Sequence, residues 1–293
     1  MTGFLGTQKM LLVSVLMLAQ QSMAMTQEKR VKLASPACVE AHIRWGKEMQ
    51  LSYISNLEKN IKKSRVWCSE SICSRANIIT DYAHQNIDDF PNILKEAIEH
   101  FKKNERIFAW YIYTSRYNNL DRINAALIRA GVTKYSPFAA MICFMADVGP
   151  LLSMDFFTCE RVRGSTQMRE WLEIVNEPFL HDQYMQEAYE RRITNMLDSE
   201  DERYYVGYYL GEPVSIGTLI INHRENYGML MNIATKAEFR RNGFAQQLIE
   251  TVLNDAWVSK LTHVVLMAEF PHRGIFERAG FRQVSEIHLC FHN

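Results

Sequence analysis

Residues 232–245 read Asn-Ile-Ala-Thr-Lys-Ala-Glu-Phe-Arg-Arg-Asn-Gly-Phe-Ala, an apolar run that turns through the pattern Arg-x-x-Gly-x-Ala into a segment with helical periodicity. Gly243 and Ala245 are small, so the backbone can approach a bulky anion where a helix begins with unpaired amide N–H groups. Those amides and the helix dipole favour phosphate by about 0.3–1 kcal/mol per charge at an exposed site. The turn is therefore predicted to hold a pyrophosphate, with Arg240 and Arg241 beside it.

The segment after this turn predicts an amphipathic helix. Apolar residues recur there at intervals of three and four, which places them on one helical face. They are Phe244, Leu248, Ile249, Val252, Leu253, Ala256 and Trp257. Such a face packs on a sheet, and the packed helix would anchor the C-terminal side of the turn.

Two blocks, Thr235 to Ala245 and Gly274 to Val284, resemble the signatures of the GCN5-related N-acetyltransferase (GNAT) superfamily. In that family the first block is the acyl-CoA pyrophosphate loop, and the second is a helix-to-strand turn that ends in Gly-Phe. The loop pattern by itself is weak, but its place after a strand hairpin and about 30 residues before the Gly-Phe turn makes it specific. The family usually has Tyr four residues before that Gly, whereas this chain has Phe276.

The residues before the loop predict a meander of three strands. Runs rich in Tyr, Val and Ile at 204–210, 214–221 and 227–233 are separated by turn residues. With the other elements they give the order β-α-α-β-β-β-α-β-α-β-β, which matches what the resemblance requires.

The remaining elements of this half are predicted from the same patterns. An earlier strand is expected at 156–162, and helices at 168–176 and 182–197 are separated by Glu177-Pro178-Phe179, because proline disfavours helix for the residue before it. Downstream we predict a buried strand at 263–268, a short helix at 274–279 and two final strands from Phe281 to Phe291.

The N-terminal half repeats the end of the C-terminal half. A strand at 107–113, a helix at 120–128, the tripeptide Arg-Ala-Gly at 129–131 and an apolar run at 141–145 follow the order of residues 263–291, where Arg-Ala-Gly recurs. This order resembles GNAT proteins with a degenerate GNAT-like unit ahead of the working one. No pyrophosphate loop pattern occurs in this half, so it is expected to wall the acceptor cleft without binding cofactor.

The predicted fold class is therefore α/β (α+β), a GNAT fold with a mixed, mostly antiparallel sheet flanked by helices and preceded by a second GNAT-like half domain. The predicted division is a signal-peptide-like segment or mis-set start at 1–24, a GNAT-like unit without a cofactor loop at 25–150 and an N-acetyltransferase domain at 151–293.

The resemblance implies acetyl-CoA as the acyl donor. Backbone groups of Ile233 and Thr235 would pair with the pantetheine arm, and the loop amides would bind the pyrophosphate. The residues implied in cofactor binding are Ile233, Ala234, Thr235, Arg240, Arg241, Asn242, Gly243, Phe244, Ala245 and Phe276.

The catalytic residues are less well marked. The strand at 227–234 has no acidic residue where many family members place a general base. Glu269, which follows a predicted strand, is the first candidate, and Glu238 and His223 are the others. Phe276 has no hydroxyl to protonate the leaving sulfur, but a thiolate is a tolerable leaving group near neutral pH.

The first 24 residues read as a secretory signal peptide with cleavage after Ala24, and their apolar run is too short to span a bilayer. Because acyl-CoA is a cytosolic metabolite, we favour a cytoplasmic protein, with export as the alternative. The six cysteines permit disulfides, yet Cys143, Cys159 and Cys290 lie in apolar runs where a free buried thiol is commoner. None of the cysteines forms a Cys-x-x-Cys pair, so the sequence does not suggest a site for zinc or another metal.

The balance of charged residues limits the classes of partner that are expected. Lys+Arg and Asp+Glu both total 33, so no basic excess points to nucleic acid. The expected reaction is transfer of an acetyl group to a primary amine of a small molecule or peptide. No stable membrane span is expected, and a homodimer is left open. The alternatives are a non-catalytic GNAT-fold module that binds acyl-CoA or a protein, and a secreted structural protein stapled by cysteines.

Overall fold

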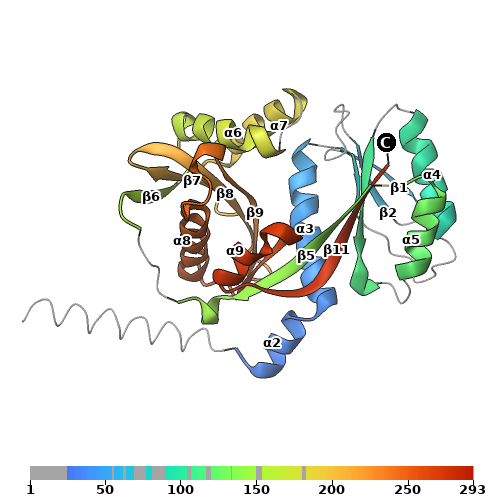
Figure 1. Ribbon diagram of the computed structural model, residues 1–293, viewed down its shortest axis with the longest axis horizontal. Helices are drawn as coiled ribbons and strands as arrows, with labels where there is room; N and C mark the ends of the chain where they lie inside the picture. The colour runs from blue at the N-terminus through green and yellow to red at the C-terminus, as the bar shows by residue number, and fades with distance from the viewer. Residues whose placement is uncertain are drawn as a thin grey trace, which may run out of the picture.

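The protein is described from a computed structural model over residues 25–54, 56–61, 64–68, 77–80, 90–103, 107–116, 120–132, 134–149, 154–179 and 183–292. Within this part of the chain the strands form one 11-stranded sheet in the order β1-β2-β3-β4-β11-β5-β10-β9-β8-β7-β6 (Figure 1). The signal-peptide-like segment at 1–24 lies outside the described residues.

The strands of the N-terminal half are β1 (Asn56–Ile61), β2 (Ser64–Cys68), β3 (Ile78–Ile79), β4 (Phe108–Tyr113) and β5 (Lys134–Phe144). Those of the C-terminal half are β6 (Phe157–Arg161), β7 (Glu202–Tyr209), β8 (Glu212–Asn222), β9 (Tyr227–Thr235), β10 (His263–Glu269) and β11 (Arg282–His292). The helices are α2 (Gln27–Leu33), α3 (Pro36–Ile54), α4 (Phe90–Lys103), α5 (Leu120–Arg129), α6 (Ser165–Phe179), α7 (Gln183–Met196), α8 (Phe244–Val258) and α9 (Arg273–Arg278).

The two halves exchange strands at the centre of the sheet. β5, from the N-terminal half, lies antiparallel between β10 and β11, so that Ile142 is opposite both Val265 and Arg282. β11 in turn pairs with β4, with Ile287 opposite Tyr113. Figure 1 shows β5 and β11 running side by side through the middle of the molecule. Each half therefore completes its sheet with a strand of the other.

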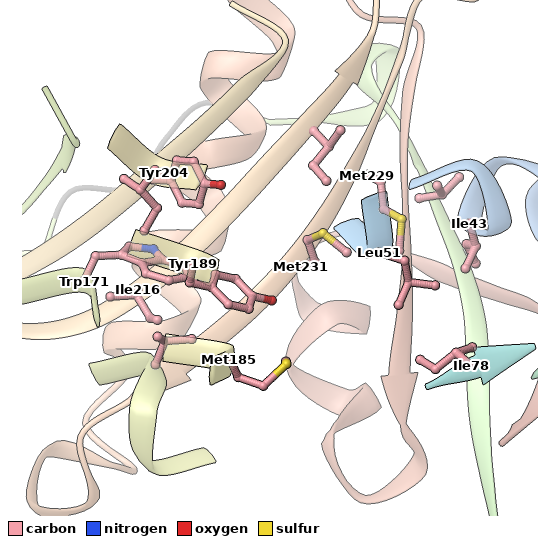
Figure 2. Close-up of a cluster of buried hydrophobic side chains, with 14 of the residues drawn as sticks. Ile43, Leu51, Ile78, Trp171, Met185, Tyr189, Tyr204, Ile216, Met229 and Met231 are labelled. Atoms are coloured by element: carbon pink, nitrogen blue, oxygen red, sulfur yellow. The ribbon is translucent and has the colours of Figure 1, made fainter. Parts of the chain in front are cut away.

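Helices cover both faces of this sheet. On one face α3, α6 and α7 share a cluster of buried side chains that includes Ile43, Trp171 and Met229, and Figure 2 shows this cluster. On the other face α8 and α9 pack with strand residues such as Leu230, while α4 and α5 form a third cluster with β4. The side chains of β9 alternate between the faces, as expected for a buried strand.

Helix α3 belongs to the N-terminal half but crosses the strands of the C-terminal half. It contacts β5, β9, β10 and β11. Gly46 allows this approach, because a Cβ atom there would lie 2.2 Å from the sulfur of Met229.

A hydrogen-bonded chain of imidazoles fixes α3 on β10. Thr262 Oγ1 donates to the Asn226 carbonyl at 2.7 Å, so it accepts from His263 Nδ1, also at 2.7 Å. His263 Nε2 is then an acceptor for His42 Nδ1 of α3 at 3.1 Å, and the His42 ring stacks on Tyr227. The contact between the halves thus needs a neutral His263, whose Nε2 must accept the hydrogen bond.

The environment of the two histidines favours the neutral form. Burial lowers the pKa of His263 to about 3, with His42 and Lys29 acting in the same direction. Burial also lowers the pKa of His42, and Glu225 opposes that shift.

Most predicted elements are confirmed, including the three-strand meander, the helix after the loop and the strand-helix-strand order β4-α5-β5 of the N-terminal half. Two predictions were wrong. α6 continues to Phe179 with Pro178 inside its last part. The two final strands are one strand, β11, with an irregularity between Gln283 and Ser285.

The cysteine prediction is confirmed in part. Cys143 and Cys290 are free and buried, and burial raises the pKa of each thiol to about 12. Cys159 is free but only half-buried, because it lies in the edge strand β6.

We expect the two halves to unfold together. Ile142→Ala removes a fully buried side chain from β5 and should cost about 2–5 kcal/mol, lowering the transitions of both halves equally. Thermal unfolding monitored by tryptophan fluorescence and by far-UV circular dichroism should give coincident curves. Ile128→Ala on α5, whose side chain is 71% exposed, is the control and should change stability by less than about 0.5 kcal/mol. Separate transitions in the Ile142→Ala variant would contradict the shared sheet.

We expect stability to fall in mild acid. The unfolded chain protonates the imidazole of His263 below its ordinary pKa of about 6.5, whereas the folded protein does so only near 3. Its stabilisation is present above pH 6.5 and lost as the pH falls toward 3, by about 2 kcal/mol between pH 7.5 and 5. Urea unfolding at several pH values measures this, and in His263→Gln the slope should be shallower. An equal slope in both proteins would exclude this origin.

Candidate functional site

The candidate site is a fork between β9 and β10. These parallel strands pair only from His263 opposite Tyr227 to Val265 opposite Met229. Beyond that point β9 continues to Thr235 along β8, and β10 continues to Glu269 along β5. The edge of β9 that faces β10 therefore has backbone donors and acceptors open to a ligand.

A bulge in β9 marks the start of this open edge. Opposite β8, the register passes from Met231 paired with Thr218 to Ala234 paired with Ile216, so β9 has one extra residue there. Asn232 lies in the bulge with a φ of 54°, a left-handed conformation that is uncommon outside glycine. The bulge changes the face to which β9 presents the residues that follow it, Ile233 to Thr235.

The predicted pyrophosphate loop joins the end of β9 to α8. Gly243 is the residue before α8, with a φ of 88° and no side-chain cap on the helix. Arg241 has a φ of 69° and is exposed. Because the first amides of a helix have no partner within it, the N–H groups at the start of α8 are available to an anion.

Hydrogen bonds hold the loop against the end of β9. Arg240 Nε donates to the carbonyl of Thr235 at 3.0 Å. Asn242 Nδ2 donates to the carbonyls of Phe239 and Arg240 at 3.2 and 3.4 Å. The structure thus brings the two parts of the sequence-predicted cofactor site into direct contact.

A cluster of aromatic rings packs around Phe244, the first residue of α8 after the loop. The ring of Phe244 stacks on Phe157 with centroids 5.6 Å apart, and Tyr209 and Phe239 lie at 4.9 and 6.2 Å. Phe244 is buried, so its role is to anchor the first turn of α8. The cluster therefore fixes the first turn of α8 against β6 and β7.

A buried polar atom at the end of β9 is unsatisfied. Within the part of the chain that the structure describes, the buried hydroxyl of Thr235 has no hydrogen-bond partner. A buried hydroxyl without a partner costs about 1–3 kcal/mol. A ligand with amide groups, such as the pantetheine arm of CoA, fits the open edge of β9.

The candidate catalytic residues are dispersed. Glu269 lies at the end of β10, half exposed, with a carboxylate oxygen 3.8 Å from His272 Nε2. Glu238 is exposed in the short 3-10 helix Ala237–Phe239 of the loop. His223 lies in the turn between β8 and β9, away from the open end of the fork, and is 3.2 Å from Asp201. The structure does not gather them into one cluster.

Phe276 is a residue of α9, and its side chain lies in the core that α9 shares with α8. Its side chain is buried, and its ring is edge-on to Phe281 with centroids 6.1 Å apart. Its position among the core residues accounts for a phenylalanine there without any cofactor.

Sequence reasoning missed the polar side chains on the opposite face of β9. Gln50 of α3 and Tyr189 of α7 lie beside Asn232, together with a buried ion pair between Arg192 and Glu202. No local pattern marks these residues, because they come from separate elements and meet only in the folded sheet.

Two structural features are absent from the described residues. None of their helices has the length and apolar character of a membrane span. Nor do three or more of their His, Cys, Asp and Glu side chains converge as ligands for a metal ion.

Comparisons with known proteins agree with this geometry. Residues 167–281 match the model of the acetyltransferase (GNAT) family. The sequence matches none of the curated proteins searched. Among solved structures, a GCN5-related N-acetyltransferase from Kribbella flavida is similar over 85% of this chain and 95% of its own, with 13% identity and a TM-score of 0.65.

Two other similar structures bear on the arrangement of units. A GCN5-related N-acetyltransferase from Sphaerobacter thermophilus has 13% identity and a TM-score of 0.58, over 74% of this chain and 71% of its own. A tandem GNAT protein from the clavulanic acid biosynthesis pathway has 11% identity and a TM-score of 0.55, over 78% of each chain. At these identities the similarity establishes the fold, and it confirms the predicted GNAT architecture with a second GNAT-like unit.

Proposed function

Because the chain contains a domain of the acetyltransferase (GNAT) family at residues 167–281, we propose that it transfers an acetyl group from acetyl-CoA to a primary amine of a small molecule or peptide. The observation that supports this most directly is the fork between β9 and β10, with its open strand edge and the uncapped start of α8 beside it. Acetyl-CoA is a cytosolic metabolite, so the cytoplasm is the proposed compartment.

The donor would lie in the fork. Its pantetheine amides would pair with the backbone of Ile233 and Thr235, and the loop amides from Arg241 to Ala245 would bind the pyrophosphate. The two negative charges of the pyrophosphate would lie near the positive end of α8 and near Arg240 and Arg241, which is electrostatically favourable. Within this proposal residues 151–293 are the working domain, and residues 25–150 serve as the unit that supports it.

The reaction would proceed by direct attack. The amine nitrogen forms a bond to the thioester carbonyl carbon, the C–S bond breaks, and CoA leaves as a thiolate. One proton is lost from the amine and is available to the sulfur. Holding both reactants in one cleft lowers the activation barrier, because the reaction between them becomes effectively unimolecular.

Two side chains are the proposed candidates for the proton transfer. Glu269 is at the open end of β10, and Glu238 is in the loop. Phe276 cannot donate a proton, so a mechanism that depends on a tyrosine at that position does not apply.

The second candidate function is a module that binds acyl-CoA, or a protein, without turnover. The features that favour it are the phenylalanine at 276 and the absence of a carboxylate on β9. Both functions share the same donor site and differ in the acceptor step.

Gly243→Glu should weaken the binding of acetyl-CoA by about tenfold or more, equivalent to at least about 1.4 kcal/mol. The substitution adds a negative charge beside the phosphates and a side chain at a φ of 88°. Isothermal titration calorimetry measures the dissociation constant. Gly131→Glu is the matched control, because Gly131 has a φ of 79° and nothing within 4 Å of an added Cβ. Equal affinity in the two variants would sink the proposed donor site.

An amine panel separates the two functions. With saturating acetyl-CoA, the purified protein should release the thiol of CoA when at least one primary amine is added. A thiol reagent measures this release. The Gly243→Glu variant should lose this release at the same donor concentration. Tight binding of acetyl-CoA without thiol release from any amine or peptide would favour the binding module.

A further inference from the structure

Helix α2 forms a basic projection at one edge of the molecule. It lies at the lower edge in Figure 1, and none of its residues is buried. Lys29 and Lys32 are exposed, and the side chain of Val31 between them is 64% exposed. This short helix therefore offers both positive charge and apolar surface to a partner.

Further cations lie next to α2, around the ring of Phe144. The guanidinium groups of Arg30 and Arg282 are each 5.1 Å from the centroid of that ring, and Arg30 also pairs with Asp147. We define the α2 surface as the residues Glu28, Lys29, Arg30, Val31, Lys32, Phe144, Asp147 and Arg282. Its cations outnumber its carboxylates by four to two, so it attracts an anionic partner.

The chain before α2 supplies an apolar run at residues 10–19, which only Ser14 interrupts. Such a run is too short to span a bilayer, but it can lie in the interface between the lipid headgroups and the acyl chains. Residues 20–24 join it to Met25, which packs against the core. Covalent geometry alone keeps the end of the run within about 22 Å of Met25. The run is therefore tethered close to the α2 surface.

Basic residues flank the apolar run on both sides. Lys9 precedes it, and three cations follow it at positions 29, 30 and 32, with Glu28 as the one acidic residue among the first 35. Lys and Arg close to an apolar segment are retained on the cytoplasmic side of a membrane, so these residues oppose export of the chain that follows. Each Lys or Arg beside anionic lipid strengthens binding by about fivefold. A single apolar insertion binds weakly, and basic residues supply the second signal that stable binding needs.

We infer that the apolar run and the α2 surface together bind the protein to the cytoplasmic face of an anionic membrane. Residues 10–19 insert at the level of the headgroups, and Lys29 and Lys32 lie over the lipid phosphates. Phe144 of the α2 surface is opposite His263, at the closed end of the fork. The fork opens toward Glu269 at the other end of β10, so the donor site stays accessible to the cytosol. The inference does not depend on the proposed acetyl transfer.

Binding of the full-length protein to vesicles tests this inference. Vesicles of phosphatidylcholine are compared with vesicles of phosphatidylcholine and phosphatidylglycerol in a flotation assay. The partition coefficient should be at least about tenfold higher on the anionic vesicles. This difference should shrink as salt is added, because salt screens the charges. Equal partitioning onto both kinds of vesicle would overturn the inference.

A pair of double variants assigns the electrostatic part to α2. Lys29→Gln with Lys32→Gln should lower partitioning onto anionic vesicles by about tenfold or more. Lys102→Gln with Lys103→Gln, at exposed positions of α4, is the matched control with the same loss of charge and should lower it by less than about twofold. Both double variants should bind acetyl-CoA as the unaltered protein does. Equal losses of vesicle binding in the two would show that α2 is not the docking surface.

A substitution in the apolar run tests its insertion. Val15→Asp places a charge in the middle of the run and should weaken binding to anionic vesicles by about tenfold or more. Val15→Leu is the control and should bind as the unaltered protein does. Unchanged binding of Val15→Asp would overturn the insertion of residues 10–19.

Export with cleavage after Ala24 is the competing outcome. Fractionation of expressing cells and intact mass spectrometry of the protein separate the two. A chain that retains residues 1–24 and sediments with the membranes supports the inference. A chain that begins at Met25 has lost the apolar run, and its recovery outside the cytoplasm would overturn the inference.

Discussion

The insertion of β5 between β10 and β11 is the constraint on which the rest of the structure depends. β5 pairs with β10 from Phe138 to Phe144 and with β11 along most of its length. Backbone groups buried in a sheet must be paired, so neither β10 nor β11 is satisfied without this strand. The last strand of the N-terminal half is thus an internal strand of the sheet that forms the candidate site.

This pairing also permits the fork. β10 is held by β5 as far as Glu269, and β9 is held by β8 as far as Thr235, so the two can separate after three paired positions without either losing its support. The bulge at Asn232 and the uncapped start of α8 lie along the opening. α3 fixes the closed end through His42 and His263, which are neutral because both are buried. A rigid frame around open backbone groups is a suitable site for a ligand with its own amides and phosphates.

The same strand exchange brings a helix of the N-terminal half against the strands of the candidate site. Helix α3 lies over strands of the C-terminal half and brings Gln50 next to the β9 bulge. The packing around this face of β9 therefore depends on both halves.

The sequence by itself determined most elements of the C-terminal half and the position of the loop before α8, because these depend on local pattern. Alternation and turn residues predicted the meander from β7 to β9, the four-residue period predicted α8, and Gly243 marked the turn into that helix. It failed at β11, where two strands were predicted but pairing with β5 and β4 holds Arg282–His292 in one strand. Tertiary structure alone decided the strand exchange, the length of the fork and the meeting of Gln50, Arg192 and Glu202 with Asn232. These depend on hydrogen bonds and ion pairs between residues far apart in the chain, which leave no periodic trace in the sequence.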